Sequence, residues 1–124
     1  MNNYLYVILL EGCPYCSNTK RLLEEYKIKN ESIVINHHQK DEYKSPQIST
    51  FPQIYFVKND LKKKVLIGGN SDIVNIIDLS NQIKKNSKMM DKLIKEYLNS
   101  STITKKILLK VLYLINSNTE LTGG

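Results

Sequence analysis

Cysteine is scarce in this sequence: the 124 residues include two cysteines, no tryptophan and three prolines. Two cysteines cannot form the disulfide framework that stabilises a small secreted domain, so a reducing compartment such as the cytoplasm is expected. No apolar run approaches the ~18 residues that a transmembrane helix needs, and the run near the N-terminus is too short for a signal peptide. A chain of this length can bury one hydrophobic core.

The net charge of +6 is concentrated near the C-terminus. Residues 1–82 carry ten basic and nine acidic residues, whereas residues 83–124 carry eight basic and three acidic ones. A basic surface can attract nucleic acid or an anionic membrane, but lysines without interleaved arginines and exposed aromatics are weak evidence for either. We therefore expect no nucleic-acid partner.

The two cysteines, Cys13 and Cys16, lie three positions apart, between a predicted strand and a predicted helix. The near-continuous apolar run at residues 4–10 predicts a buried strand. Residues 17–27 have apolar side chains at helical spacing and predict a helix. A Cys-x-x-Cys pair at such a junction is typical of thiol–disulfide redox motifs.

Cys13 is expected just before that helix, where unpaired backbone N–H groups and the helix dipole favour an anion. Such an environment lowers the pKa of a thiol and supplies the thiolate, which is the nucleophile in disulfide exchange. Cys16, one turn further along, can then attack a mixed disulfide on Cys13 and release the product. This pattern predicts a catalytic pair.

Two other interpretations of the cysteine pair remain open. The pair could be half of a structural zinc site, but such sites usually need four Cys or His ligands. The chain offers only these two cysteines and the adjacent pair His37 and His38, whose side chains would point to opposite faces of a strand. The cysteines could also be two unreactive thiols in a binding domain.

The rest of the chain predicts an α/β pattern followed by helices. A strand is expected at residues 31–36, and together with the preceding strand and helix it makes a β-α-β unit with parallel strands. The other expected elements are a short helix at residues 41–44, strands at residues 50–57 and 64–67, a helix from Asp72 to about Leu79, and helical segments at residues 89–98 and 103–115.

Proline and glycine residues mark turns in the second half of this pattern. Pro52 stands near the start of a strand, so it either begins an edge strand or follows a cis peptide bond in a special turn. Gly68 and Gly69 precede a helix, and such a turn presents free N–H donors that can seat a carboxylate. Asn70 or Ser71 is expected to cap that helix.

The sequence resembles a dithiol glutaredoxin over roughly residues 3–85, because three motifs of that family occur in the family's order. These are Cys13-Pro14-Tyr15-Cys16, Thr50-Phe51-Pro52 and Gly68-Gly69-Asn70-Ser71-Asp72. The resemblance implies an α/β, thioredoxin-like fold in which a four-stranded mixed sheet is flanked by helices. Here extra C-terminal helices would be added to that fold.

The resemblance also implies roles for individual residues. Cys13 resembles the nucleophile and Cys16 the resolving thiol, and Pro52 matches a cis-proline. Phe51, where the family usually has Val, would pair its backbone with the cysteinyl part of glutathione. The implied glutathione-binding residues are Tyr15, Phe51, Pro52, Gly69, Asn70, Ser71 and Asp72, the last of these through the amine of the γ-glutamyl end.

Two positions depart from the family's pattern. Leu10 stands where glutaredoxins usually carry a basic residue three places before the first cysteine, and Ile48 and Ser49 replace a cation near the Thr-x-Pro step. Losing one charge-assisted contact typically costs ~1–3 kcal/mol of binding, so a weakened affinity for glutathione is expected. The nearest substitutes in the sequence are Lys40, Lys44 and Gln47.

These observations predict an enzyme, a glutathione-dependent thiol–disulfide oxidoreductase. It would reduce disulfide-containing or glutathionylated proteins, with glutathione as the co-substrate and no metal. One alternative keeps the redox pair but takes electrons from a thioredoxin reductase, because the basic residues are missing. Another is a non-catalytic adaptor that uses the fold and the basic tail to bind a partner.

The predicted organisation is a glutaredoxin-like domain at residues 1–85 and a helical C-terminal extension at residues 86–124. The apolar positions of the extension recur at helical spacing, so its helices are expected to pack on the domain with their lysines in water. A helix pair that binds a partner or forms an oligomer is the alternative.

Overall fold

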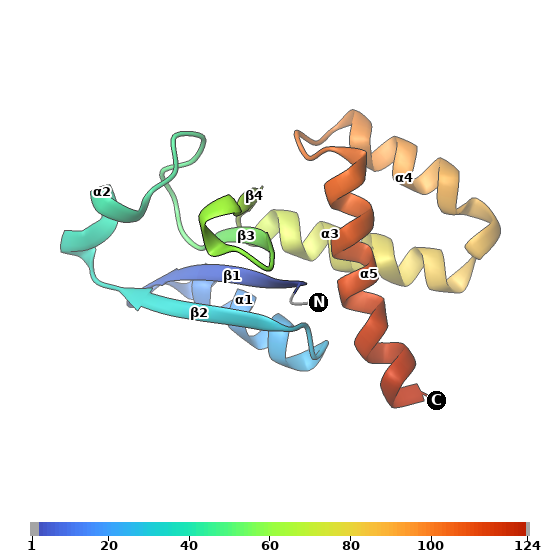
Figure 1. Ribbon diagram of the computed structural model, residues 1–124, viewed down its shortest axis with the longest axis horizontal. Helices are drawn as coiled ribbons and strands as arrows, with labels where there is room; N and C mark the ends of the chain where they lie inside the picture. Colours follow the sequence, from blue (N-terminus) through green and yellow to red (C-terminus); the bar gives the residue numbers. More distant parts are fainter. Residues whose placement is uncertain (1–2, 124) are drawn as a thin grey trace.

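Four strands form a single mixed sheet in the order β2-β1-β3-β4. In the computed structural model, which describes residues 3–123 and the side chains of residues 3–116, β1 (Asn3–Leu10) lies parallel to β2 (Asn30–Ile35). It lies antiparallel to β3 (Gln53–Lys58), which pairs in turn with β4 (Val65–Gly68). The predicted four-stranded mixed sheet is confirmed (Figure 1).

Helices connect and flank these strands. The segment between β1 and β2 is α1 (Pro14–Glu25), which completes the predicted β-α-β unit. A short turn, η1 (His37–Gln39), leads into α2 (Lys40–Tyr43), and η2 (Leu61–Lys63) connects β3 to β4. The next helix, α3 (Asn70–Lys85), contacts both α1 and β4. None of the helices in the described part of the chain has the length and apolar character of a membrane span.

The apolar run of β1 lies at the centre of the fold, as its composition predicts. Leu5 and Val7 are fully buried, and Ile8 and Leu9 are nearly so. The side chain of Tyr6 is only half-buried, because one face of the sheet is incompletely covered. The core therefore lies mainly on the face of the sheet that α1 and α3 cover.

The C-terminal segment folds into η3 (Ser87–Met89), α4 (Met90–Asn99) and α5 (Lys105–Gly123). Both long helices contact α3, and Figure 1 shows α5 crossing α3. Their buried side chains belong to the same hydrophobic core as the strands; these are Ile94, Leu108, Val111, Leu112, Leu114 and Ile115. Lys84, Lys85, Lys88, Lys92 and Lys95 are exposed, as expected. The domain boundary at residue 85 stays a prediction.

Of the two alternatives for Pro52, the cis peptide is confirmed: β3 lies between β1 and β4, so it is no edge strand, and the Phe51–Pro52 peptide bond is cis. Two other local expectations need correction. His37 and His38 lie in η1 and not on a strand, because the Asn36 side chain accepts the His38 N–H and starts a turn there. The helix predicted to end near Leu79 continues to Lys85.

Candidate active site

The first cysteine, Cys13, is the residue that caps α1. Its backbone is extended, and the backbone N–H of Cys16 donates a hydrogen bond to Cys13 Sγ at 3.2 Å. Pro14 takes the first helical position, where the missing N–H breaks no hydrogen bond. The half-buried Cys13 sulfur therefore faces the positive end of the helix, in the geometry that favours a sulfur anion.

The second cysteine, Cys16, lies inside the protein. Its side chain is 3% exposed, and the backbone N–H of Leu10 donates to its Sγ at 3.3 Å. Burial, and next the hydrogen bond shared with Cys13, raise the pKa of the Cys16 thiol to about 12, although the Leu10 N–H acts in the opposite direction. At neutral pH this residue is accordingly a thiol, which suits a resolving group better than an attacking one.

The loop before β3 forms a second side of the site. The carbonyl oxygen of Phe51 lies 3.6 Å from Cys13 Sγ and accepts the weak hydrogen bond of the thiol. Phe51 and Pro52 are buried, so this loop is held firmly against the sheet. The cis peptide between them is the alternative that the sequence left open for Pro52.

The start of α3 forms the third side. Gly69 lies against the Pro52 loop, since a Cβ atom at Gly69 would be 3.4 Å from the Pro52 carbonyl oxygen. Gly69 is also the residue that caps α3, and its backbone N–H donates to Asp72 Oδ2 at 2.9 Å. The prediction that Asn70 or Ser71 caps this helix is wrong, because Asp72 reaches back to the turn instead.

Asn70 has a different role from the expected one. Its side-chain Nδ2 donates to Thr19 Oγ1 at 2.9 Å, and Thr19 is fully buried within α1. The hydrogen bond ties the start of α3 to the helix that carries both cysteines. Sequence reasoning missed Thr19, although its position one turn after Cys16 places it on the same helix face.

Three other residues predicted for the site, Tyr15, Ser71 and Lys44, have fewer contacts with its centre. Tyr15 and Ser71 are exposed, each in the first turn of its helix. Lys44, a candidate substitute for the missing cations, forms an ion pair with Asp41 at 3.2 Å and lines a cavity on the sheet face. The described contacts of Lys44 are therefore with Asp41 and the cavity on the sheet face, not with Cys13.

In the part of the chain whose side chains are described, no group of three or more His, Cys, Asp and Glu side chains lies close enough to hold a metal ion. Among the described residues, therefore, Cys13 and Cys16 are not part of a complete set of zinc ligands. Both cysteines are free thiols in this structure.

Comparison with known proteins agrees with this geometry. Residues 4–61 match the glutaredoxin family model. This stretch, which spans β1 to β3, is therefore similar to the glutaredoxins. A solved structure, that of glutaredoxin 1 from Francisella tularensis complexed with cacodylate, is similar with a TM-score of 0.51 and 24% sequence identity, over 62% of this chain and 94% of that chain. No curated protein matches.

The structural likeness bears on the fold, which is thioredoxin-like as the sequence predicts. The matched residues include Cys13 and Cys16 of the Cys-x-x-Cys motif and Pro52 of the cis-proline loop. Family and fold together support a thiol–disulfide oxidoreductase. The α3 turn from Gly68 to Asp72 lies after the matched range, so its role depends on the geometry described above.

The raised pKa of Cys16 gives the stability of the protein an expected pH dependence. The free energy of unfolding should fall as the pH rises above about 9, because the unfolded chain then releases the Cys16 proton whereas the folded state holds it up to about 12. The unfolded state binds fewer protons in this window, so the free energy of unfolding decreases with pH. The decrease is about 1.4 kcal/mol per pH unit at most.

Urea unfolding of the reduced protein measures this slope between about pH 8 and pH 10. The control is Cys16→Ala, which lacks the Cys16 thiol and keeps the other side chains. The wild type should lose more stability than the variant across that range. Equal slopes in the two proteins would contradict the assigned state of Cys16.

Proposed function

We propose that the protein is a glutathione-dependent thiol–disulfide oxidoreductase that reduces protein disulfides and glutathione mixed disulfides. The observation that carries the proposal is the position of Cys13 Sγ, 3.2 Å from the Cys16 N–H and 3.6 Å from the Phe51 carbonyl. A sulfur anion there is stabilised by the start of α1 and lies beside a loop that can align a disulfide.

The reaction begins with attack of the Cys13 thiolate on one sulfur of the substrate disulfide. A mixed disulfide forms, and the other substrate sulfur leaves as a thiolate. Cys16 then loses its proton to solvent, attacks Cys13 Sγ and expels the second substrate thiolate. The substrate gains two electrons and the pair becomes a disulfide. Two glutathione molecules return the pair to the dithiol and leave as glutathione disulfide.

The Leu10 N–H supports the second step. While Cys13 carries the thiol, its hydrogen bond with Cys16 helps to raise the pKa of the Cys16 thiol. Once Cys13 is held in a mixed disulfide, its effect on the pKa of the Cys16 thiol changes. The Leu10 N–H, by contrast, remains 3.3 Å from the Cys16 sulfur. A donor in that position stabilises the Cys16 thiolate as it forms.

Glutathione would lie against the surface formed by α1, the cis-proline loop and the start of α3. Phe51 offers its backbone beside Cys13, and Tyr15 flanks this surface from an exposed position. The free N–H groups of Asn70 and Ser71 in the first turn of α3 suit the γ-glutamyl carboxylate. Asp72 Oδ2 already accepts the Gly69 N–H, which leaves Oδ1 for the γ-glutamyl amine.

A thioredoxin reductase as electron donor is the second candidate. It is favoured by the apolar, half-buried Leu10 and by Ser49, which stand where the family usually supplies cations for the glycyl carboxylate. Lys44 is also engaged in an ion pair with Asp41, whose negative charge offsets its own. We place either activity in the cytoplasm, acting on disulfide-containing or glutathionylated proteins.

The donor experiment separates these candidates. The oxidised protein is mixed with NADPH and either glutathione plus glutathione reductase or thioredoxin reductase alone, and NADPH consumption is followed with a small glutathione mixed disulfide as substrate. Turnover with the glutathione system supports the proposal. Turnover with thioredoxin reductase alone replaces it with the second candidate, and turnover with neither leaves the non-catalytic adaptor.

A further inference from the structure

A cavity of about 440 Å³ lies on the sheet face that the helices leave open. Because α2 has only four residues, it covers one end of this face and leaves the middle uncovered. The floor is formed by Tyr6 and Ile8 of β1 with Tyr55 and Leu66 of the next two strands. Neither cysteine lines it. Its size falls within the range of small-molecule sites.

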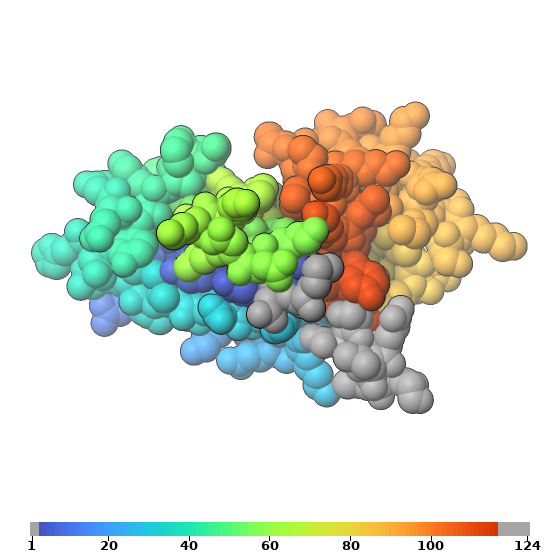
Figure 2. All heavy atoms as spheres, in the orientation of Figure 1, coloured from blue at the N-terminus to red at the C-terminus, as the bar shows by residue number. Residues whose placement is uncertain are grey.

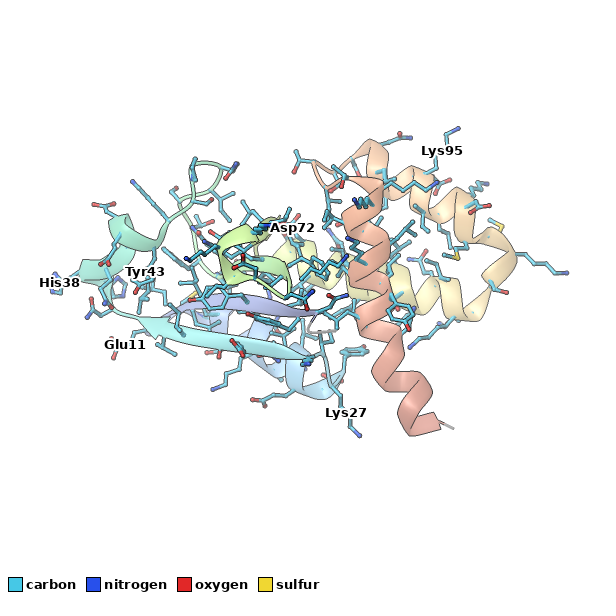
Figure 3. The ribbon with its side chains drawn as sticks, viewed as in Figure 1. Glu11, Lys27, His38, Tyr43, Asp72 and Lys95 are labelled. Atoms are coloured by element: carbon cyan, nitrogen blue, oxygen red, sulfur yellow. The ribbon has the colours of Figure 1, made fainter. Side chains whose placement is uncertain are left out.

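Aromatic rings make up much of its wall. The rings of Tyr6 and Tyr55, paired across β1 and β3, have centroids 6.4 Å apart and are tilted by 42°. Tyr55 is buried, and its hydroxyl donates to Gln53 Oε1 at 3.2 Å, which fixes its orientation. Tyr43 lines the cavity from α2, at the labelled position in Figure 3. Rings held in this way offer a planar ligand a surface for stacking.

The rim carries an excess of positive charge. Lys44, Lys62 and Lys64 line the cavity together with one acidic residue, Glu42, and Lys44 is paired with Asp41, so Lys62 and Lys64 carry the excess. Lys64 Nζ lies 5.2 Å from the centroid of the Tyr55 ring, and this cation–π contact holds the ammonium group at the wall. Among the residues with described side chains, neither Lys62 nor Lys64 forms an ion pair, so both charges are available to a ligand.

The two sides of the cavity come from separate parts of the chain. Residues 42–47 lie on one side and residues 61–64 on the other, and Figure 2 shows both segments on the visible face. The η2 turn that carries Lys62 is fixed because Asp60 Oδ1 accepts the Lys62 N–H at 3.0 Å. The lysines are thus presented from a structured turn above the aromatic floor.

We propose that this cavity binds a small aromatic anion. The ring of the ligand lies against Tyr6, Tyr43 and Tyr55, and its carboxylate, sulfonate or phosphate group meets the ammonium groups of Lys62 and Lys64. Charge complementarity selects the anion, and the aromatic floor selects a planar ring over an aliphatic chain. This site is independent of the proposed redox reaction, since Cys13, Phe51 and Asp72 contribute nothing to its lining.

The probe for the test is 8-anilinonaphthalene-1-sulfonate, an aromatic anion whose fluorescence rises on binding. Titration of the full chain is expected to give one saturable site that weakens as salt is added, because the ion pairs are screened. N-phenyl-1-naphthylamine, which has the same rings without the sulfonate, should bind at least about tenfold more weakly. Amide chemical shifts recorded during the titration should change most at Tyr6, Tyr55 and Leu66.

The variant K62Q/K64Q should weaken the sulfonate probe at least about tenfold while leaving the neutral probe unchanged. The matched control is Lys63→Gln, on the same turn, because Lys63 does not line this cavity. All three positions are exposed, so folding is preserved. The proposal is overturned by no binding at millimolar probe, by equal affinities in wild type and K62Q/K64Q, or by shift changes centred on another surface.

Discussion

Replacing Cys13 by serine is expected to lower the rate of disulfide reduction by about a thousandfold or more, to the level of the uncatalysed exchange. A serine hydroxyl at the start of α1 does not ionise at neutral pH, so the Cys16 N–H at 3.2 Å has no sulfur anion to stabilise. The measurement is NADPH consumption with the electron donor that supports the wild type, on a glutathione mixed disulfide and on a protein disulfide.

Cys16→Ser is the matched control for this experiment. It keeps Cys13 and the end of the helix, so it should still attack a glutathione mixed disulfide and be resolved by a second glutathione molecule. Reduction of a protein disulfide, which needs the second thiol, should fall sharply. The assignment of roles fails if the serine variant at Cys13 remains active, or if the two variants lose the same activities to the same extent.

The second large effect is expected at Gly68, whose substitution by alanine should cost about 3 kcal/mol of folding free energy. Gly68 has φ of +143°, a backbone conformation that favours glycine. A Cβ atom there would also overlap with the carboxylate of Asp72. Because Asp72 accepts the Gly69 N–H, displacing it would open the turn that starts α3. Urea unfolding measures the loss.

Gly12→Ala provides the comparison. Gly12 also has a positive φ, of +74°, but a Cβ atom there would meet no other atom within 4 Å. That variant should therefore lose only the cost of the backbone conformation, about 1 kcal/mol. If the two alanine variants are equally stable, then the contact with Asp72 is not the cause of the Gly68 effect.

The local features of this site were predictable from sequence. The position of Cys13 before a helix follows from the apolar run of β1, the helical spacing after Cys16 and the proline at the first helical position. These are short-range signals, and each acts within a few residues. The parallel pairing of β1 with β2 followed as well, because two strands joined by a helix make a β-α-β unit. The antiparallel pairing of β1 with β3 was not predicted.

The contacts between distant segments were not predictable. The prediction of Asn70 or Ser71 as the cap used residue type alone, whereas the fold turns Asn70 towards Thr19, 51 positions earlier. The raised pKa of Cys16 depends on how completely the surrounding helices bury it. The open sheet face depends on the length of α2, and a four-residue helix has too little periodicity to be bounded from sequence.

The core shared by the strands and α5 has a thermodynamic consequence. Leu108 and Val111 are fully buried in the same apolar cluster as Ile54 and Ile73, and the Ser80 hydroxyl donates to Asn116 Oδ1 at 2.8 Å across α3 and α5. Neither part of the chain can lose its packing without exposing the other to water. Heat should therefore melt both parts in one cooperative transition, and removing the residues after about residue 85 would remove part of the folded interior.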